Sequence, residues 1–263
     1  MLQQNAVTGA LFLIGILYNS WIMAIGALIG VFSSTVAAII LRYETKDIHK
    51  GLYGFNGVLL GVTLFYFFEI NTLLFFLTII GSVLSSFIMH FMHKKNLYPY
   101  TFPFILSSWI ILFIVNTFEL IPLQKYELLS TLDFNLFSSV ILGFGQVMFQ
   151  ENIITGLIFL IGILISSRLS AFYALFGSFI GSIFAIILSF DIGLISLGIF
   201  SFNAVLCGLA FADNKKISLV YAASSVILSV FILSVMNSYN LTTLTFPFIL
   251  ATWLMIFIQK NRS

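Results

Sequence analysis

Residues 8–17 read TGALFLIGIL, and residues 155–164 read TGLIFLIGIL, with eight of the ten positions identical. Two further stretches repeat in the same order. Residues 51–64 (GLYGFNGVLLGVTL) match 198–211 (GIFSFNAVLCGLAF), and residues 97–110 (LYPYTFPFILSSWI) match 241–254 (LTTLTFPFILATWL). The chain is therefore an internal duplication. Many membrane transport proteins consist of two related halves, with the pathway where the halves meet.

The composition assigns the chain to the membrane. Of its 263 residues, 60% are hydrophobic and 8% are charged, whereas a soluble domain carries about 25% charged residues. Strands of a membrane barrel alternate between apolar and polar residues, and stretches such as 171–190 and 217–235 do not. Because lipid requires every backbone polar group to be satisfied internally, the sequence predicts an all-α integral membrane protein.

The apolar runs predict ten membrane spans, five in each half. They lie near residues 8–18, 20–41, 51–68, 72–92 and 101–118, and then near 155–166, 169–190, 192–212, 217–236 and 243–258. An odd number of spans in each half means that the second half is inverted relative to the first. The predicted domains are a first repeat (1–118), an extracellular connector (119–134) and a second repeat (135–263).

The second repeat begins with a predicted re-entrant half-helix at residues 135–149, which ends in Gly143-Phe144-Gly145-Gln146. In the repeat alignment Met1 corresponds to Met148. We therefore expect the counterpart of this half-helix to be missing from the first repeat.

The positive charges support the span count and orient the chain. With ten spans, one side of the membrane holds ten basic residues and the other side holds only Lys125; the ten are Arg42, Lys46, Lys50, Lys94, Lys95, Arg168, Lys215, Lys216, Lys260 and Arg262. Basic residues concentrate in cytoplasmic loops. Both termini are therefore predicted to be cytoplasmic. A net charge of +2 is too small to indicate a nucleic-acid partner.

An asparagine interrupts an apolar run in both halves. Asn56 lies in Gly54-Phe55-Asn56-Gly57, and Asn203 lies in Ser201-Phe202-Asn203-Ala204. A buried amide without partners costs about 2–7 kcal/mol, so each asparagine must find some. It either caps backbone groups freed where a helix breaks or holds two helices together. The repetition in both halves favours the helix break.

A Thr-Phe-Pro-Phe motif also occurs in both halves, at residues 101–104 and 245–248. Pro103 and Pro247 either break a helix and free a carbonyl upstream, or begin a helix in its first turn. In both cases the Thr101 and Thr245 hydroxyls lie near backbone carbonyls. The repeated motifs therefore supply hydrogen-bond acceptors and aromatic rings with very few charges.

Together these motifs resemble those of the urea transporter family, bacterial-type urea channels included. The family carries two copies of an FNxxL motif, here 55–59 and 202–206, and two copies of a motif close to LPxxTxPF, of which 101–104 and 245–248 keep TxPF. A third element, GQV followed by an aromatic residue, is present at 145–149. The leucine–proline pair of the second motif is altered, since Tyr98 follows Leu97 and Thr242 follows Leu241.

The resemblance implies passive, channel-like transport of urea, inverted five-span repeats and a homotrimer with one pore per subunit, in the inner (plasma) membrane for a bacterial-type channel. The family's pore constriction maps onto Phe55, Leu59, Thr101, Phe202, Leu206 and Thr245, and a further binding position maps onto Gln146 and Phe149. No cofactor or metal is implied. Asn56, Asn203, Pro103 and Pro247 are expected at helix breaks.

The residue chemistry agrees with that resemblance and leaves alternatives. Urea is flat and neutral, so hydroxyl and carbonyl oxygens can accept its N–H groups while rings confine its faces. Few charges in the pore disfavour ion conduction. The same lining would suit another small amide or ammonia. A proton-coupled transporter would need intramembrane acids, and only Glu151 is a candidate. No nucleophile, base and metal set for an enzyme is present, and His90 and His93 lack further metal ligands.

Overall fold

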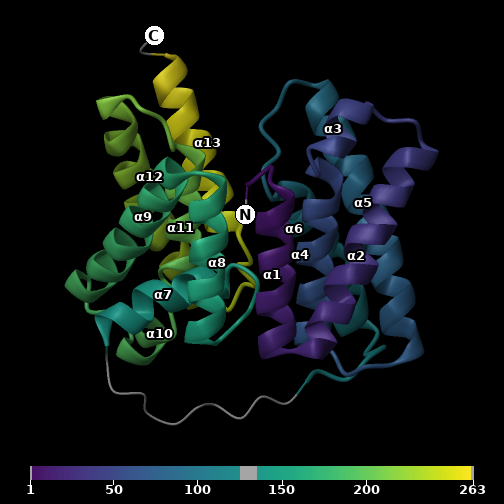
Figure 1. Cartoon of the computed structure of the whole chain (residues 1–263). Helices are drawn as coiled ribbons and strands as arrows, with labels where there is room; N and C mark the ends of the chain where they lie inside the picture. The colour runs from purple at the N-terminus through teal and green to yellow at the C-terminus, as the bar shows by residue number, and fades with distance from the viewer. Residues whose placement is uncertain (1, 125–134, 262–263) are drawn as a thin grey trace. The chain divides into compact units, whose positions relative to one another are not determined.

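A computed structural model describes residues 2–124 and 135–261, which form thirteen helices and no strand (Figure 1). The chain divides into two compact units. The first unit is Ile16–Glu127, and the second unit comprises Met1–Gly15 and Leu128–Ser263. The boundary between them falls inside the first helix, so most of that helix belongs with the second half of the chain.

Six helices precede residue 125. They are α1 (Ala6–Asn19), α2 (Trp21–Ile40), α3 (Thr45–His49), α4 (Leu52–Phe67), α5 (Thr72–Lys94) and α6 (Phe102–Thr117). Ser20 and Asn71 begin α2 and α5, since their side chains accept hydrogen bonds from the Met23 and Leu74 amides. Such caps satisfy the backbone donors left over at a helix start.

Seven helices follow. They are α7 (Leu136–Gln146), α8 (Ile153–Ser166), α9 (Arg168–Ile187), α10 (Ile192–Ser196), α11 (Phe202–Ala210), α12 (Lys216–Ser238) and α13 (Phe246–Lys260). Asn135, Asn152 and Ser167 cap α7, α8 and α9. The half-helix predicted at 135–149 is therefore helical over Leu136–Gln146.

The sequence repeat is also a repeat of backbone structure. α8, α9 and α10 begin and end 147 positions after α1, α2 and α3, and α12 lies 144 positions after α5. Residues with positive φ recur in the same way: Arg42 with Ser189, Gly51 with Gly198, and Tyr100 with Leu244. These matches extend to turns whose side chains differ. The halves differ at α4 and α11, which have 16 and 9 residues.

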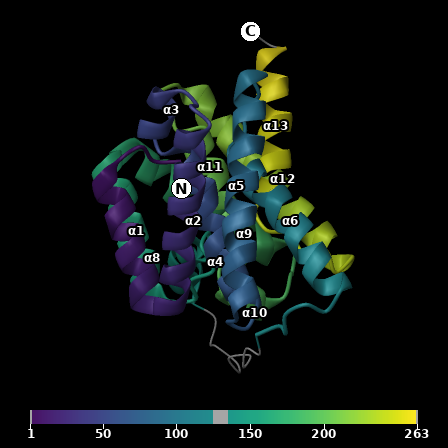
Figure 2. The ribbon, with the colours of Figure 1, turned by 90° about the vertical axis from the view of Figure 1, so that its right-hand side faces the viewer.

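Helix α1 packs on α8 through a reciprocal pair of hydrogen bonds. The Thr8 hydroxyl donates to the Gly162 carbonyl over 2.7 Å, and the Thr155 hydroxyl donates to the Gly15 carbonyl over 3.0 Å. The Phe12 and Phe159 rings meet between them, with centroids 4.9 Å apart. Both views show the two helices side by side (Figures 1 and 2). Thr155 is the repeat equivalent of Thr8, and Gly162 is the repeat equivalent of Gly15. The two hydrogen bonds are therefore equivalent in the two repeats.

In the first unit, α2 and α4 pack with their backbones in contact. A Cβ added to Gly30 would meet the Gly57 carbonyl, and one added to Gly61 would meet the Gly26 carbonyl. Small residues allow helices in membranes to approach this closely. In the second unit, Ala204 and Tyr173 stand where Gly57 and Gly26 stand in the first.

Nine of the ten predicted spans correspond to one helix each, and the prediction of one span over 192–212 is wrong. That segment forms α10 and α11, with five residues between them. The chain turns there at Gly198, whose φ of 75° is accessible to glycine at little cost. A short helix, α3, also lies in the predicted loop 42–50.

Four of the described helices are long and apolar enough to cross a membrane, namely α2, α5, α9 and α12. Six shorter apolar helices accompany them, namely α1, α4, α6, α7, α8 and α13. The domain limits 1–118, 119–134 and 135–263 stay predictions, since the compact units reflect packing rather than sequence similarity. Residues 125–134 of the connector lie outside the described part of the chain.

Candidate functional site

Asn56 ties the middle of the first repeat to the start of α6. It lies in the first turns of α4 and is fully buried. Its Oδ1 accepts a hydrogen bond from the Phe104 amide over 3.1 Å, and its Nδ2 donates to the Tyr100 carbonyl over 3.3 Å. The first amides of a helix have no partner within the helix. Asn56 thus supplies one from a different helix.

Thr101 is the N-cap residue of α6 and is fully buried. Its carbonyl accepts the Ile105 amide over 3.1 Å, while its side chain makes no capping bond. Pro103 lies in the first turn of α6. Pro103 therefore begins a helix rather than breaking one. At this position the missing N–H costs nothing, since a first-turn amide has no partner within the helix.

The second unit repeats this arrangement with one difference. The Phe248 amide of α13 donates to Asn203 Oδ1 over 3.1 Å, Thr245 is the N-cap residue, and Pro247 lies in the first turn. The Asn203 Nδ2, however, is buried without a hydrogen-bond partner within the described residues. The second copy therefore holds an amide donor that the first copy uses on its own backbone.

The apolar members of the predicted pore set divide by burial. Leu59 and Leu206 are fully buried, on α4 and α11. Phe55 and Phe202 are half-buried. Each phenylalanine directly precedes the asparagine that caps a helix. Every half therefore brings one Asn and one Thr to the same helix start, with a Phe next to the Asn in the sequence.

Gln146 and Phe149 lie at the end of α7, where the chain reverses. Gln146 is the last residue of α7, and its Nε2 donates to the Leu197 carbonyl over 3.1 Å. Phe149 has a φ of 56°. The reversal requires Gly145, because a Cβ there would meet the Gln150 carbonyl. Gln146 thus joins α7 to the turn between α10 and α11.

A buried serine network, which the sequence analysis did not identify, lies beside α7. The Ser139 and Ser182 hydroxyl oxygens are 3.1 Å apart, and those of Ser182 and Ser201 are 2.6 Å apart. Ser178 also donates to the Val140 carbonyl over 2.7 Å. These bonds hold α7 against α9 and the start of α11.

The remaining ionisable candidates lie outside this arrangement. Glu151 is exposed. His93 Nδ1 lies 3.1 Å from the carboxylate of buried Asp47, and His90 stacks on Tyr43. The described residues contain no group of three or more His, Cys, Asp or Glu side chains that could hold a metal ion.

The apolar helices, four of which are long enough to cross a membrane, are those of an integral membrane protein. A sequence model of the family described as "Urea transporter" matches residues 1–260. The chain belongs to the urea transporter family, whose members transport solutes rather than catalyse reactions.

Curated relatives agree with the family match. Urea transporter 1 of Ovis aries is 27% identical over 284 residues, covering 98% of this chain and 73% of the relative. Urea transporter 1 of Rattus norvegicus is also 27% identical, over 288 residues with the same coverage.

Proposed function

We propose that this protein conducts urea passively, down its gradient, through a narrow pore. The pore residues are Phe55, Leu59, Thr101, Phe202, Leu206 and Thr245, with Gln146 and Phe149 at a further binding position. The repeated helix start carries this proposal: one asparagine caps each of α6 and α13, beside a buried threonine and a half-buried phenylalanine.

Urea needs oxygen acceptors to replace the water that it loses on entering a narrow pore. Each helix start carries a buried threonine at its N-cap position, and we propose that its hydroxyl is one of these acceptors. Because a buried donor left unpaired costs about 1–3 kcal/mol, acceptors at the narrowest point lower the barrier for urea. The phenylalanines would confine its flat faces, and the absence of charge among these residues would exclude ions.

Passive transport follows from the same residues. Coupling to protons or ions requires ionisable groups inside the membrane, and none belongs to this set. Glu151, the acid considered for such a role, is exposed.

The test is solute flux into proteoliposomes that contain the full chain. Urea flux should exceed that of acetamide and ammonia, and it should not change when a pH gradient or a membrane potential is imposed. Empty liposomes and the double variant T101V/T245V serve as controls. Flux that rises several-fold with either gradient would replace this proposal by a coupled mechanism. Ammonia flux above urea flux would replace urea as the substrate.

The inverted repeat, the orientation and the trimer are also proposed. The reciprocal bonds between Thr8 and Gly162 and between Thr155 and Gly15 support a two-fold relation between α1 and α8. The ten basic residues on one side support cytoplasmic termini. A cysteine introduced at Gln124 should be labelled from outside intact cells, and one at Lys215 should not. Crosslinking in membranes should yield trimers.

A further inference from the structure

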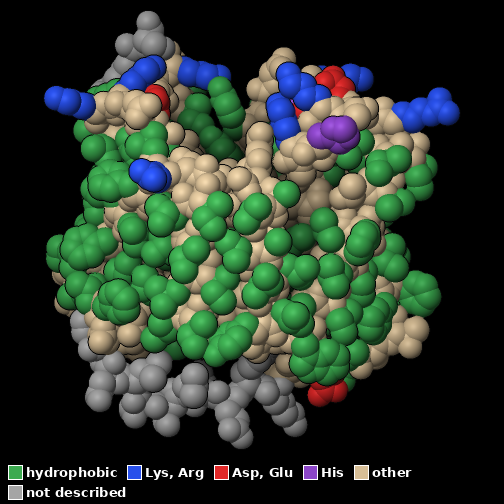
Figure 3. Space-filling view, viewed as in Figure 1, with side chains coloured by type: hydrophobic (Ala, Val, Ile, Leu, Met, Phe, Trp, Pro, Cys, Tyr) green, Lys and Arg blue, Asp and Glu red, His purple; other side chains and the backbone are tan. Residues whose placement is uncertain are grey.

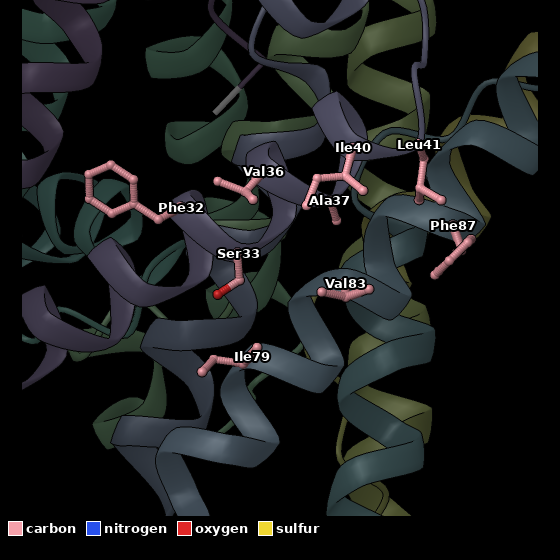
Figure 4. A pocket seen from close by; sticks show the side chains of 9 residues that line it. All are labelled: Phe32, Ser33, Val36, Ala37, Ile40, Leu41, Ile79, Val83 and Phe87. Atoms are coloured by element: carbon pink, nitrogen blue, oxygen red, sulfur yellow. The ribbon is translucent and has the colours of Figure 1, made fainter.

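A groove runs along the first unit between α2 and α5. Figure 4 shows its walls: Phe32, Ser33, Val36, Ala37, Ile40 and Leu41 from α2 and its last turn, and Ile79, Val83 and Phe87 from α5. Its volume is about 500 Å³, within the range of pockets that hold small ligands. Every lining residue except Ser33 is apolar, so the groove suits a hydrocarbon chain.

The groove opens to the surface of two helices that are long enough to span the membrane. Phe32 is 65% exposed and Ile40 is 72% exposed, which a water-facing surface would tolerate poorly. The groove therefore faces either lipid or another apolar surface. The groove alone does not distinguish these occupants, but the charges at its end do.

Basic residues lie where the groove ends. Arg42 directly follows Leu41 and is exposed. Lys94 lies seven residues after Phe87, about two helical turns, so it continues the groove-lining face of α5; it is also exposed. Figure 3 shows Lys and Arg side chains at the end of the first unit that carries α3, with hydrophobic side chains along its flank.

The segment that carries Arg42 is held against α5. Tyr43 stacks on His90 with ring centroids 3.8 Å apart and planes within 1° of parallel. Burial raises the pKa of Tyr43, so the ring stays neutral beside Arg42. The two acids of this loop are Glu44 and Asp47, and Asp47 is buried and paired with His93. No ion pair involves Arg42 or Lys94 within the described residues.

We propose that an anionic phospholipid occupies this groove, with an acyl chain between α2 and α5 and its phosphate held by Arg42 and Lys94. Arginine binds phosphate oxygens through two parallel N–H bonds, and lysine adds a point charge. Anionic lipids are enriched on the cytoplasmic leaflet, which is the side predicted for both residues. A second copy of the chain would have to bury these two cations at the same contact.

The second repeat supplies an internal comparison. Its residues at the positions of Arg42 and Lys94 are Ser189 and Ser238. Phe184, a larger residue, stands at the position of Ala37. The charges are not repeated, so we assign the site to the first repeat alone.

The experiment is lipid binding to the purified full chain, measured by native mass spectrometry with phosphatidylglycerol and phosphatidylcholine of identical acyl chains. Phosphatidylglycerol should bind more tightly. The R42Q/K94Q variant should weaken its binding about five-fold for each basic residue removed and leave phosphatidylcholine unaffected. Val36→Trp and Ala37→Phe, which fill the groove, should weaken both lipids. Val36 is 47% exposed, so a larger side chain there should not prevent folding. Val36→Trp therefore tests the groove even if Ala37→Phe fails to fold.

The matched control is K215Q/K216Q, which removes the same charge from another basic loop. It should leave binding unchanged. An equal loss of phosphatidylglycerol binding in this control would mean that the lipid is attracted to basic residues in general. That result would overturn the proposed site. Unchanged lipid binding in folded Val36→Trp would also overturn it. A change of subunit stoichiometry without a change in bound lipid would assign the groove to a second copy of the chain instead.

Discussion

The turn that follows α2 and the turn that follows α9 share one backbone and differ in chemistry. The Arg42 and Tyr43 amides donate to the Ile39 and Ala38 carbonyls, and the Ser189 and Phe190 amides donate to the equivalent Ile186 and Ala185 carbonyls. Tyr43 meets Tyr53 at 5.3 Å between ring centroids, and Phe190 meets Phe200 at 5.0 Å. The backbone and ring positions have persisted while the polar groups have not.

The same contrast extends to the short helix in each turn. In the first repeat, buried Asp47 of α3 pairs with His93 of α5. The equivalent positions in the second repeat are Leu194 and Asn237, and the cluster there is apolar, with Ile195, Phe200 and Leu233 in its core. Duplicated halves thus retain geometry where the main chain requires it and diverge where only side chains meet.

The largest difference is expected between the two asparagines. Asn56→Ala removes two hydrogen bonds to backbone groups, and Asn203→Ala removes one. At about 1–3 kcal/mol for each buried group that loses its partner, unfolding free energies should fall by about 2–6 and about 1–3 kcal/mol respectively. Denaturant titration of the purified protein measures both.

Asn71→Ala is the control for this pair, because Asn71 caps α5 outside the repeated motif and should cost about 1 kcal/mol. Equal losses at positions 56 and 203 would show that the Tyr100 bond contributes little. The missing hydrogen bond at Asn203 Nδ2 would then have no measurable effect on the unfolding free energy.

The next difference concerns the close helix contact. Gly57→Ala introduces into the first repeat the residue that Ala204 supplies in the second, and its Cβ would meet the Gly30 carbonyl and Ser34. Overpacking of this kind costs about 1–3 kcal/mol. Ala204→Gly should cost about 1 kcal/mol or less, through helix propensity.

Gly9→Ala provides the control, since nothing lies within 4 Å of an added Cβ there. It should stabilise α1 by about 0.5–1 kcal/mol. Denaturation midpoints of the three variants decide the matter. A tolerated Gly57→Ala would mean that α2 and α4 can separate without loss.

The two threonines should behave alike despite the difference between their neighbouring asparagines. Thr101→Val and Thr245→Val retain shape and remove a hydroxyl, so a urea donor would face a methyl group. A barrier raised by about 1–3 kcal/mol lowers flux about 5- to 150-fold. Urea flux is measured together with the amount of folded protein. Full flux in the folded double variant would exclude both threonines from the pore.

The smallest effects are expected at the reciprocal bonds of α1 and α8. Thr8→Val and Thr155→Val each remove one buried hydroxyl bond to a helix carbonyl. Such bonds between membrane helices contribute about 0.6 kcal/mol on average and at most about 1.7. Thermal unfolding should therefore show two small and equal losses. Unequal losses of thermal stability would mean that the two hydrogen bonds are equivalent in geometry but not in energy.

The sequence predicted the features that the repeat presents twice. Asn56 and Asn203 stand out because the same polar residue interrupts an apolar run in both halves, and both bind a helix start. The serine network had no such signal, since the residues equivalent to Ser182 and Ser201 are Thr35 and Gly54. A single serine in an apolar run does not indicate which helix it contacts.

Some helix starts were predicted closely, and one helix break was missed where backbone torsion decides. Helices α7 and α8 begin at Leu136 and Ile153, within two residues of the starts predicted near 135 and 155. The break between α10 and α11 depends on the positive φ of Gly198, and a glycine within an apolar run is equally compatible with a continuous helix. The sequence also left open whether Pro103 and Pro247 break a helix or begin one, because proline permits both. The structure was needed to decide.

The hydrogen bonds between α1 and α8 join residues 140 and 154 positions apart. At a ribosomal rate of about 5–20 residues per second, α8 is synthesised roughly 7–30 s after α1. During that interval the Thr8 hydroxyl has no Gly162 carbonyl to bind. Helix α1 therefore lies in the membrane without its final partner, or it contacts another helix or protein transiently. Helix α1 thus reaches this final partner only after α2 to α8 have been made, and the order of assembly differs from the order of synthesis.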